Sequence, residues 1–309
     1  MKSLRHRAEY GALRGLVRAL GVVPWGSAGR VGASVGALGF RPLGVRRRVV
    51  ERQIAAAFPE LSEEQVAEMA RASYRHLGQS AIETALLPGL GQAGVLRLVS
   101  EVENWEAVER AQAGGKGIVV VAGHLGNWEL AAAYMAARGI PLDVIVRRMG
   151  NPLFDAYLNQ TREQLGVKVV YDAQAVRHTP RALREGRAVG FVADQGVRGL
   201  ASTFVPFFGR PAKTPRGAAV FALRFGSPVV FATALRKPDG TYLVGFEDIP
   251  VIDTGNRESD VDALVLRFTR VLEKWVRRAP EQYFWQHRRW RRQPPDTPPE
   301  LRDPAAEPT

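Results

Sequence analysis

Apolar and polar residues along this chain repeat with two periods, and the alternation between them predicts the fold. From residue 118 to about residue 246, short apolar runs alternate with segments in which apolar positions recur every three or four residues. The short runs are typical of buried strands, and the segments between them of amphipathic helices. The predicted strands are Ile118–Val121, Leu142–Val146, Val167–Tyr171, Ala188–Ala193 and Pro228–Leu235, with Tyr242–Phe246 as a hairpin partner at one edge. This alternation predicts an α/β fold with a mainly parallel sheet flanked by helices.

Helical periodicity also precedes and follows this region. Ser62 and Gln65 have the spacing of a capping box, which predicts a long helix to about Leu87, ended by the Gly- and Pro-containing residues 88–94. Three further helices are predicted: one that follows the arginines at 46–48 and runs to about Ala56, one from about Asn104 to Gln112, and one from roughly Ser259 to Arg278. The predicted domains are a basic helical region at 1–58, an α/β domain at 59–292 and a Pro- and acid-rich disordered tail at 293–309.

The first 52 residues carry most of the charge imbalance. They contain eleven Lys and Arg against Glu9 and Glu51, a local net charge of +9, mixed with Leu, Val, Ala and aromatic residues. Arginines interrupt every apolar window that could cross a bilayer, and no signal-peptide pattern is present. Basic amphipathic helices lying on an anionic membrane fit this pattern, so residues 1–58 are predicted to be a membrane-associating region. The alternative is a basic solvated face on ordinary packing helices.

Composition limits the chemistry that remains. The 309 residues are 46% apolar, which supports a substantial core, and they include no cysteine. Disulfides, thiolate zinc sites and a cysteine nucleophile are therefore excluded. The net charge of +12 implies an anionic partner, which could be nucleic acid, an anionic lipid surface or an acidic carrier protein.

One stretch, G-I-V-V-V-A-G-H-L-G-N-W-E-L from Gly117 to Leu130, delivers a histidine from a strand into a turn. Ligands of open parallel sheets bind beyond the carboxyl ends of the strands, which is where His124 would lie. Glu129 can meet His124 only if the histidine lies in the turn and Glu129 in the first helical turn, with Asn127 as N-cap. A neutral imidazole oriented by a carboxylate is a competent base near pH 7. The alternative is a histidine that caps the strand end beside a solvated Glu129.

Two more polar side chains follow predicted strands. Arg147 comes after the strand ending at Val146, and Asp194 after the one ending at Ala193. We expect Arg147 to contact an anion or oxyanion, and Asp194 to orient His124 or bind an acceptor hydroxyl. Helix capping and salt bridges at loop ends are the competing explanation.

Two aromatic segments lie closer to the carboxyl terminus. One segment contains Phe204, Val205, Phe207 and Phe208, which could line an apolar trough or dip into lipid, with packing of the phenylalanines in the core as the alternative. Thr214 and Pro215 are predicted to cap the next helix, whose amino end, with Lys213 and Arg216, would form an anion site. The basic and aromatic run P-E-Q-Y-F-W-Q-H-R-R-W-R-R fits either base stacking on nucleic acid or a belt near lipid headgroups.

An ordered set of motifs resembles the bacterial lipid A biosynthesis acyltransferases of the late lauroyl/myristoyl type, within the H-x-x-x-x-D/E acyltransferase superfamily. The motifs are R-x-x-x-x-A-F-P-E-L-S, G-H-L-G-N-W-E, R-R-M-G-N-P-L-F-D, A-D-Q, P-F-F-G-R-P-A-K-T and P-E-Q-Y-F-W-Q-H-R-R-W, and they run from about residue 46 to 292. The chain departs from the family at Val146-Arg147-Arg148, where tyrosine-arginine-proline is usual, and at Gln53, where asparagine is usual.

The resemblance implies that His124 and Glu129 are the catalytic pair and that Asn127, Arg147 and Asp194 belong to the site. It implies acyl transfer from an acyl carrier protein or coenzyme A thioester to a hydroxyl of an anionic membrane glycolipid, foremost a lipid A precursor. The expected location is the cytoplasmic face of the bacterial inner membrane, either peripheral or anchored by the N-terminus. No metal, cofactor or nucleic-acid partner is expected, and residues 59–292 would form the acyltransferase domain.

Three alternatives stay open. Relatives in the superfamily acylate mannosylated phosphoinositides, so the acceptor could be another glycolipid. A lipid esterase would use water in place of the acceptor hydroxyl. We expect the chain to have no G-x-S-x-G nucleophile elbow, which disfavours an esterase with a serine nucleophile. A non-catalytic protein that binds anionic membranes or nucleic acid would explain the charge but not the residues at the strand ends.

Overall fold

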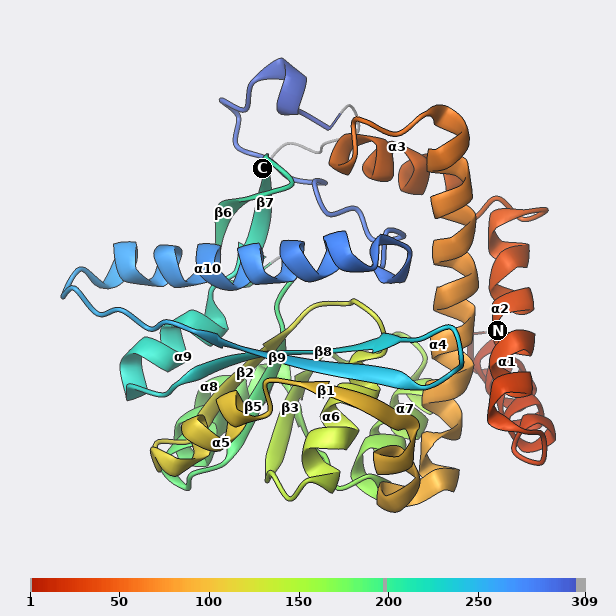
Figure 1. The fold of residues 1–309 in the computed structure, drawn as a ribbon, viewed down its shortest axis with the longest axis horizontal. Coiled ribbons are helices and arrows are strands. Elements are labelled where there is room, and N and C mark those ends of the chain that lie inside the picture. Colours follow the sequence, from red (N-terminus) through yellow and green to blue (C-terminus); the bar gives the residue numbers. More distant parts are fainter. Residues whose placement is uncertain (1, 197–198, 304–309) are drawn as a thin grey trace.

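The centre of the molecule is a seven-stranded sheet (Figure 1). A computed structural model describes residues 2–196 and 199–303. The strand order is β1-β9-β8-β2-β5-β3-β4, and every neighbouring pair is parallel except the hairpin of β8 and β9. The strands are β1 (Val99–Glu103), β2 (Ile118–Ala122), β3 (Leu142–Val146), β4 (Lys168–Tyr171), β5 (Ala188–Val192), β8 (Val229–Arg236) and β9 (Tyr242–Ile249). The predicted mainly parallel sheet is confirmed, but β9 is not at an edge, because β1 pairs outside it.

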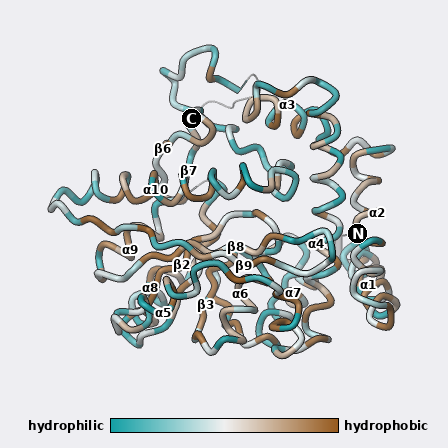
Figure 2. The backbone as a smooth tube through the Cα atoms, viewed as in Figure 1, coloured by the Kyte–Doolittle hydropathy of each residue, from teal (hydrophilic) through white to brown (hydrophobic). Residues whose placement is uncertain are grey.

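Helices cover both faces of this sheet. Apolar side chains of β2 alternate between two clusters: Val119 and Val121 face one that includes α8, α9 and α10, and Ile118 and Val120 face one that includes α5 and α6. The apolar residues therefore concentrate around the central strands (Figure 2). The helices are α1 (Lys2–Leu20), α2 (Trp25–Phe40), α3 (Arg47–Ala57), α4 (Glu63–Leu98), α5 (Glu106–Ala113), α6 (Trp128–Ala137), α7 (Pro152–Gln164), α8 (Asp172–Arg184), α9 (Gly217–Phe225) and α10 (Arg257–Arg278).

Helix α4 stands at one end of the sheet, with α1 and α2 packed along its outer side (Figure 1). The capping box predicted for Ser62 and Gln65 is present. The helix continues past its predicted end near Leu87, with Pro88 inside it, and it is interrupted at Gly91, whose φ of 60° is not helical. Among residues 2–196 and 199–303, no helix is long and apolar enough to cross a membrane.

Helices α2 and α4 meet backbone to backbone through three glycines. A Cβ atom at Gly36 would lie 2.1 Å from the carbonyl oxygen of Tyr74, and one at Gly78 would lie 2.3 Å from the carbonyl oxygen of Gly32. Neither neighbour can move aside without shifting a helix, since both are main-chain atoms. The spacing Gly32-x-x-x-Gly36 therefore sets how closely the N-terminal helices approach α4.

Replacing Gly36 by alanine is expected to destabilise the protein by about 1–3 kcal/mol, because the added methyl group overpacks the crossing. Chemical denaturation would measure the change. Gly15→Ala in α1 is the matched control, since nothing lies within 4 Å of a Cβ there. That control should be neutral or stabilise by up to ~1 kcal/mol through helix propensity. Equal effects of the two substitutions would contradict a backbone contact at Gly36.

The segment after β5 forms a hairpin that the sequence analysis missed. Strands β6 (Ser202–Phe207) and β7 (Arg210–Pro215) pair antiparallel. Thr214 and Pro215 therefore lie in a strand, and the prediction that they cap the next helix is wrong, because α9 begins at Gly217 after Arg216. Phe207 and Phe208 are buried in the core instead of facing a trough or lipid, with Phe208 packed 5.1 Å from the ring of Phe58.

The carboxyl-terminal segment is also part of the core. Trp285 and Trp290 are 0% and 1% exposed, so the basic and aromatic run neither forms a lipid belt nor presents these rings to nucleic acid. Residues 293–303, which belong to the predicted disordered tail, instead make specific contacts. The Gln293 side chain donates to the Leu301 carbonyl oxygen, and Asp303 forms an ion pair with Arg52. Residues 304–309 of that tail lie outside the described part of the chain.

Candidate active site

His124 and Asp194 meet at the carboxyl edge of the sheet. Strands β2 and β5 are parallel neighbours with Ala122 opposite Val192, so the residues that follow each strand by two positions come together. The His124 Nδ1 atom lies 2.6 Å from Asp194 Oδ1, and the His124 backbone N–H donates to Oδ2 at 3.0 Å. Two hydrogen bonds to one carboxylate fix both the backbone and the ring of the histidine.

Asp194 is suited to stabilise a positive charge on that ring. Its burial opposes ionisation, but the charge and hydrogen bonds of His124, with the nearby Arg289, outweigh burial and hold the pKa of Asp194 well below its usual range. The carboxylate therefore stays ionised, and its bond to Nδ1 favours the tautomer with the proton on that atom. This leaves Nε2 of His124, whose side chain is 22% exposed, able to accept a proton.

Glu129 lies in the first turn of α6, as predicted, but its carboxylate binds an arginine. Arg162 of α7 donates from Nη2 to Oε1 at 2.6 Å and from Nε to Oε2 at 2.8 Å. The indole of Trp128 donates to Oε1 at 3.1 Å. Of the two carboxylates considered for orienting His124, Asp194 is the one bonded to its ring, and Glu129 joins α6 to α7.

Asn127 is the N-cap of α6, which confirms its predicted position. Its side-chain oxygen accepts from the Leu130 backbone N–H at 3.0 Å and from the Thr84 hydroxyl at 3.2 Å, and the residue is 1% exposed. The cap occupies the oxygen, so this side chain fixes where α6 begins. The first-turn N–H groups of that helix then point toward the edge that carries His124.

A polar stripe on α4 holds the loop between His124 and α6. His76, Ser80 and Thr84 occupy one face at four-residue spacing. His76 Nε2 lies 3.3 Å and Ser80 Oγ 3.4 Å from the Gly126 carbonyl oxygen, while Thr84 donates to Asn127. On the other side, a Cβ at Gly126 would lie 2.0 Å from the Ala234 carbonyl oxygen, so only glycine fits there. The loop is therefore clamped between α4 and β8.

His76 predicts a pH dependence of stability. Burial lowers the pKa of His76 from 6.5 to about 4, and the bond to Gly126 only partly opposes this. The unfolded chain therefore binds a proton between these values that the folded chain does not, so stability is full above pH 6.5 and falls on acidification. Denaturation should detect a loss of about 2 kcal/mol between about pH 7.5 and pH 5 in the wild type that His76→Gln lacks. Parallel pH curves for the two proteins would contradict a buried neutral histidine.

The carboxyl-terminal segment lies against His124, a position that sequence reasoning missed: the Phe284 backbone N–H donates to the His124 carbonyl oxygen at 2.9 Å. The ring of Phe284 lies 5.9 Å from His124, and the ring of Trp128 lies 4.8 Å from it on α6. Arg289, 3% exposed, donates to the Lys213 carbonyl and the Thr214 hydroxyl, each at 2.7 Å. A mixed basic and aromatic run does not itself distinguish an exposed surface from a buried wall, which explains the error.

The remaining predicted residues lie in different environments. Arg147 is exposed at the carboxyl end of β3, the edge where His124 lies. Arg216 forms ion pairs with Glu258 at 2.7 Å and Asp262 at 3.2 Å, both on α10. Lys213 lies in β7 and not at a helix start. The predicted anion site at the amino end of α9 is therefore not formed as expected, because Arg216 is already paired with two carboxylates of α10.

The expectation that no G-x-S-x-G sequence occurs is wrong. Residues 32–36 read G-A-S-V-G, but they lie in the middle of α2. The Ser34 hydroxyl donates to the Arg30 carbonyl oxygen at 3.0 Å, as an ordinary helical serine does. A nucleophile elbow needs a sharp turn between a strand and a helix, so this serine does not have that geometry.

Comparison with known proteins places the chain among lipid acyltransferases. A family model described as bacterial lipid A biosynthesis acyltransferase matches residues 2–292. The chain is 28% identical over 274 residues to the lipid A biosynthesis lauroyltransferase of Escherichia coli K12, covering 87% of each chain. It is 28% identical to the palmitoleoyltransferase of the same organism, covering 85% of each. It is also 25% identical to a phosphatidylinositol mannoside acyltransferase of Mycobacterium tuberculosis H37Rv, over 64% of each.

Proposed function

The chain belongs to the bacterial lipid A biosynthesis acyltransferase family and is an O-acyltransferase, and we propose that its acceptor is a membrane glycolipid, foremost a lipid A precursor. The proposed donor is a fatty acyl thioester of acyl carrier protein or coenzyme A. The bond of 2.6 Å between His124 Nδ1 and Asp194 Oδ1 is the observation that supports the proposal, because a carboxylate bonded to Nδ1 would leave Nε2 to accept a proton from the acceptor hydroxyl.

In the proposed reaction, His124 Nε2 removes the proton from the acceptor hydroxyl as its oxygen attacks the thioester carbonyl carbon. The carbon–sulfur bond then breaks, and the imidazolium returns the proton to the departing thiolate, which leaves an ester and a free thiol. Asp194 stabilises the imidazolium between these two steps. No acyl-enzyme is required.

The charge that develops on the carbonyl oxygen needs donors, and the first turn of α6 supplies the best candidates. Four backbone N–H groups before it are already used: His124 donates to Asp194, Leu125 to Gly123, Gly126 to Gln282 and Asn127 to Ala234. The N–H groups of Trp128 and Glu129 are the next in the chain and have no partner four residues back in the helix. We assign the oxyanion contact to them, with Arg147 as a second source of positive charge at the same edge.

The outer face of the N-terminal helices supports a peripheral membrane association. Val31, Val35 and Leu38 lie on one side of α2 and are 39%, 48% and 52% exposed, and Val22 and Leu43 in the adjoining turns are 90% and 69% exposed. Large exposed apolar strips are uncommon on soluble surfaces, and arginines at 18, 30, 41, 46 and 48 accompany this one. An apolar strip with basic residues fits the interface of an anionic bilayer, so we assign this face to the cytoplasmic side of the inner membrane.

Acyl transfer assays with the purified chain test the proposal. Labelled acyl carrier protein and acyl coenzyme A would be offered with a lipid A precursor and with mannosylated phosphoinositide. Label on the lipid A precursor is the expected result, while label only on the phosphoinositide would move the acceptor to the second glycolipid class, as the mycobacterial relative suggests. Release of free fatty acid without transfer would favour a hydrolase, and anionic-vesicle binding without turnover would overturn catalysis.

A further inference from the structure

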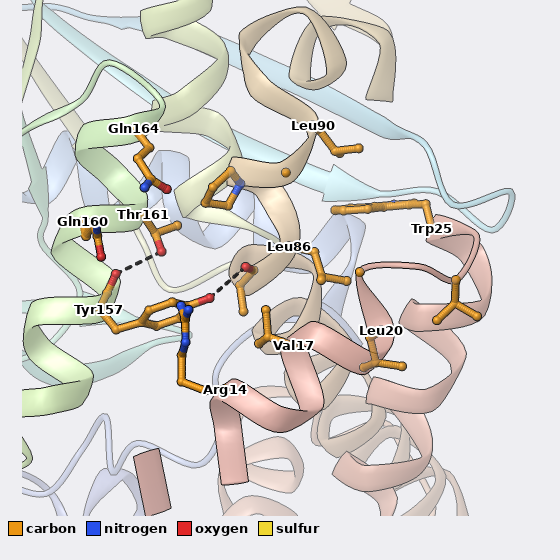
Figure 3. Close-up of a pocket in the computed structure, with 15 residues that line it drawn as sticks. Arg14, Val17, Leu20, Trp25, Leu86, Leu90, Tyr157, Gln160, Thr161 and Gln164 are labelled. Atoms are coloured by element: carbon orange, nitrogen blue, oxygen red, sulfur yellow. Dashed lines mark hydrogen bonds between the residues drawn. The ribbon is translucent and has the colours of Figure 1, made fainter. Parts of the chain in front are cut away.

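A cavity of about 400 Å³ lies between α1, the start of α2, α4 and α7 (Figure 3). Neither His124 nor Asp194 is among the residues that line it. One wall is polar and consists of α7 side chains such as Gln160 and Gln164. The opposite wall is apolar and includes Val17, Leu86 and Trp25 from three different helices. The cavity is therefore amphipathic across its width.

A positive charge lies at one end of the cavity. The Arg14 guanidinium lies 5.2 Å from the centre of the Tyr157 ring, and the Tyr157 hydroxyl donates to the Ala85 carbonyl oxygen at 3.1 Å. Within residues 2–196 and 199–303, no carboxylate forms an ion pair with Arg14. An arginine without a counter-ion beside apolar side chains favours a ligand that brings its own negative charge.

The cavity also has an unsatisfied donor and an apolar approach. Trp25 Nε1 is buried and has no hydrogen-bond partner in the described part of the chain. Val23 lines the cavity and is also 38% exposed, next to Val22 at 90%. The cavity therefore lies next to the exposed apolar surface of the N-terminal helices.

We infer that this cavity binds one acyl chain with an anionic head, the chain along Val17 and Leu86 and the head at Arg14. Its volume is at the lower end of the ~300–1000 Å³ typical of small-molecule sites, so a single chain fits better than a whole lipid with several. Two sources share this chemistry: a free fatty acid and a single-chain anionic phospholipid. The inference does not depend on the reaction proposed for His124.

The helices α4 and α7 line the cavity and also contact α6, which follows His124. Thr84, next to Ala85 of the cavity, donates to Asn127, and Arg162, next to Thr161, binds Glu129. The helix behind each wall therefore also carries a side chain that bonds to α6 or to its N-cap. Occupancy of the cavity would stabilise the arrangement of α4 and α7 on which the catalytic edge rests.

Equilibrium dialysis of the full chain with dodecanoate, lauroyl lysophosphatidylglycerol and dodecanol tests the inference. One saturable site for an anionic probe is expected, weakened at least about tenfold by Val17→Trp or Leu86→Trp, because either indole fills the cavity. Val176→Trp on α8, where the valine is 74% exposed, is the matched control and should bind as the wild type does. Thermal denaturation would verify that each variant is folded.

The charged head has its own test. Arg14→Gln should remove the preference for dodecanoate over dodecanol, whereas Arg7→Gln, an exposed arginine of the same helix, should retain it. Binding of dodecanoate would identify a fatty-acid site, and binding of the lysophospholipid alone a membrane-lipid site; both support the inference. Binding that survives both tryptophan variants would place the acyl chain outside this cavity. Binding that disappears in His124→Ala would place the acyl chain at the edge of the sheet that carries His124. Either result would overturn the inference. Absence of saturable binding by any probe would do the same, whatever the acyl transfer assays show.

Discussion

Replacing His124 by alanine is expected to lower kcat for acyl transfer by about 10²- to 10⁴-fold, because the acceptor hydroxyl loses its general base. The substitution also removes the bond between the ring and the buried Asp194 carboxylate, so the stability of the variant is measured together with its activity. Initial rates with a saturating thioester donor would measure kcat, and denaturation would establish that the variant is folded.

The chain offers a matched control in a second histidine–carboxylate pair. His178 Nε2 lies 2.5 Å from Asp143 Oδ2, and the His178 side chain is 20% exposed. Asp143 is at the beginning of β3, the end opposite to the proposed site. His178→Ala should therefore keep kcat within a few-fold of the wild type. A His124→Ala variant as active as His178→Ala would eliminate the proposed base.

Asp194→Asn should be nearly as damaging, with an expected loss of about 10²- to 10⁴-fold in kcat. An asparagine has one acceptor oxygen where Asp194 uses two, so it cannot accept both the ring and the backbone N–H of His124. Its amide N–H₂ would favour the imidazole tautomer with the proton on the wrong nitrogen. The measurement is again kcat, with KM determined separately to detect any change in substrate binding.

Glu129→Gln distinguishes the two carboxylates. Because Glu129 binds Arg162 and not the His124 ring, its effect should be smaller than that of Asp194→Asn and should resemble that of Arg162→Gln. In a double-mutant cycle the two substitutions should be strongly non-additive, since each removes the same ion pair. Additive effects, or a larger loss for Glu129→Gln than for Asp194→Asn, would mean that Glu129 acts directly on the reacting groups.

The sequence predicted the part of the site that depends on local pattern and strand order. Apolar runs locate β2 and β5, and the rule that the carboxyl ends of parallel strands meet at one edge predicts that His124 and Asp194 lie close together. The N-cap role of Asn127 followed from residue type and position. The partner of Glu129 did not, because Arg162 is 33 residues away on a helix whose orientation depends on tertiary packing.

Other errors have the same physical origin. Strand β1, V-S-E-V-E, has few apolar residues and pairs with β9, which lies more than a hundred residues later in the chain. The hairpin of β6 and β7 contains three prolines and the basic residues Arg210 and Lys213, so its pattern does not favour a strand. The aromatic carboxyl-terminal segment is buried only because α3, α10 and the hairpin surround it. Local propensity contains no information on such long-range contacts.

The glycine crossing of α2 and α4 has a geometric consequence for the proposed membrane enzyme. Because backbone touches backbone at Gly36 and Gly78, and α4 in turn bonds to the loop after His124, direct contacts connect the apolar strip on α2 to the loop that carries the imidazole. A bilayer that receives this strip would hold His124 at a fixed height and tilt above the lipid headgroups. Acceptor hydroxyls would then be selected partly by their depth below the water interface, which makes membrane composition a variable of specificity alongside the chemistry of the acceptor.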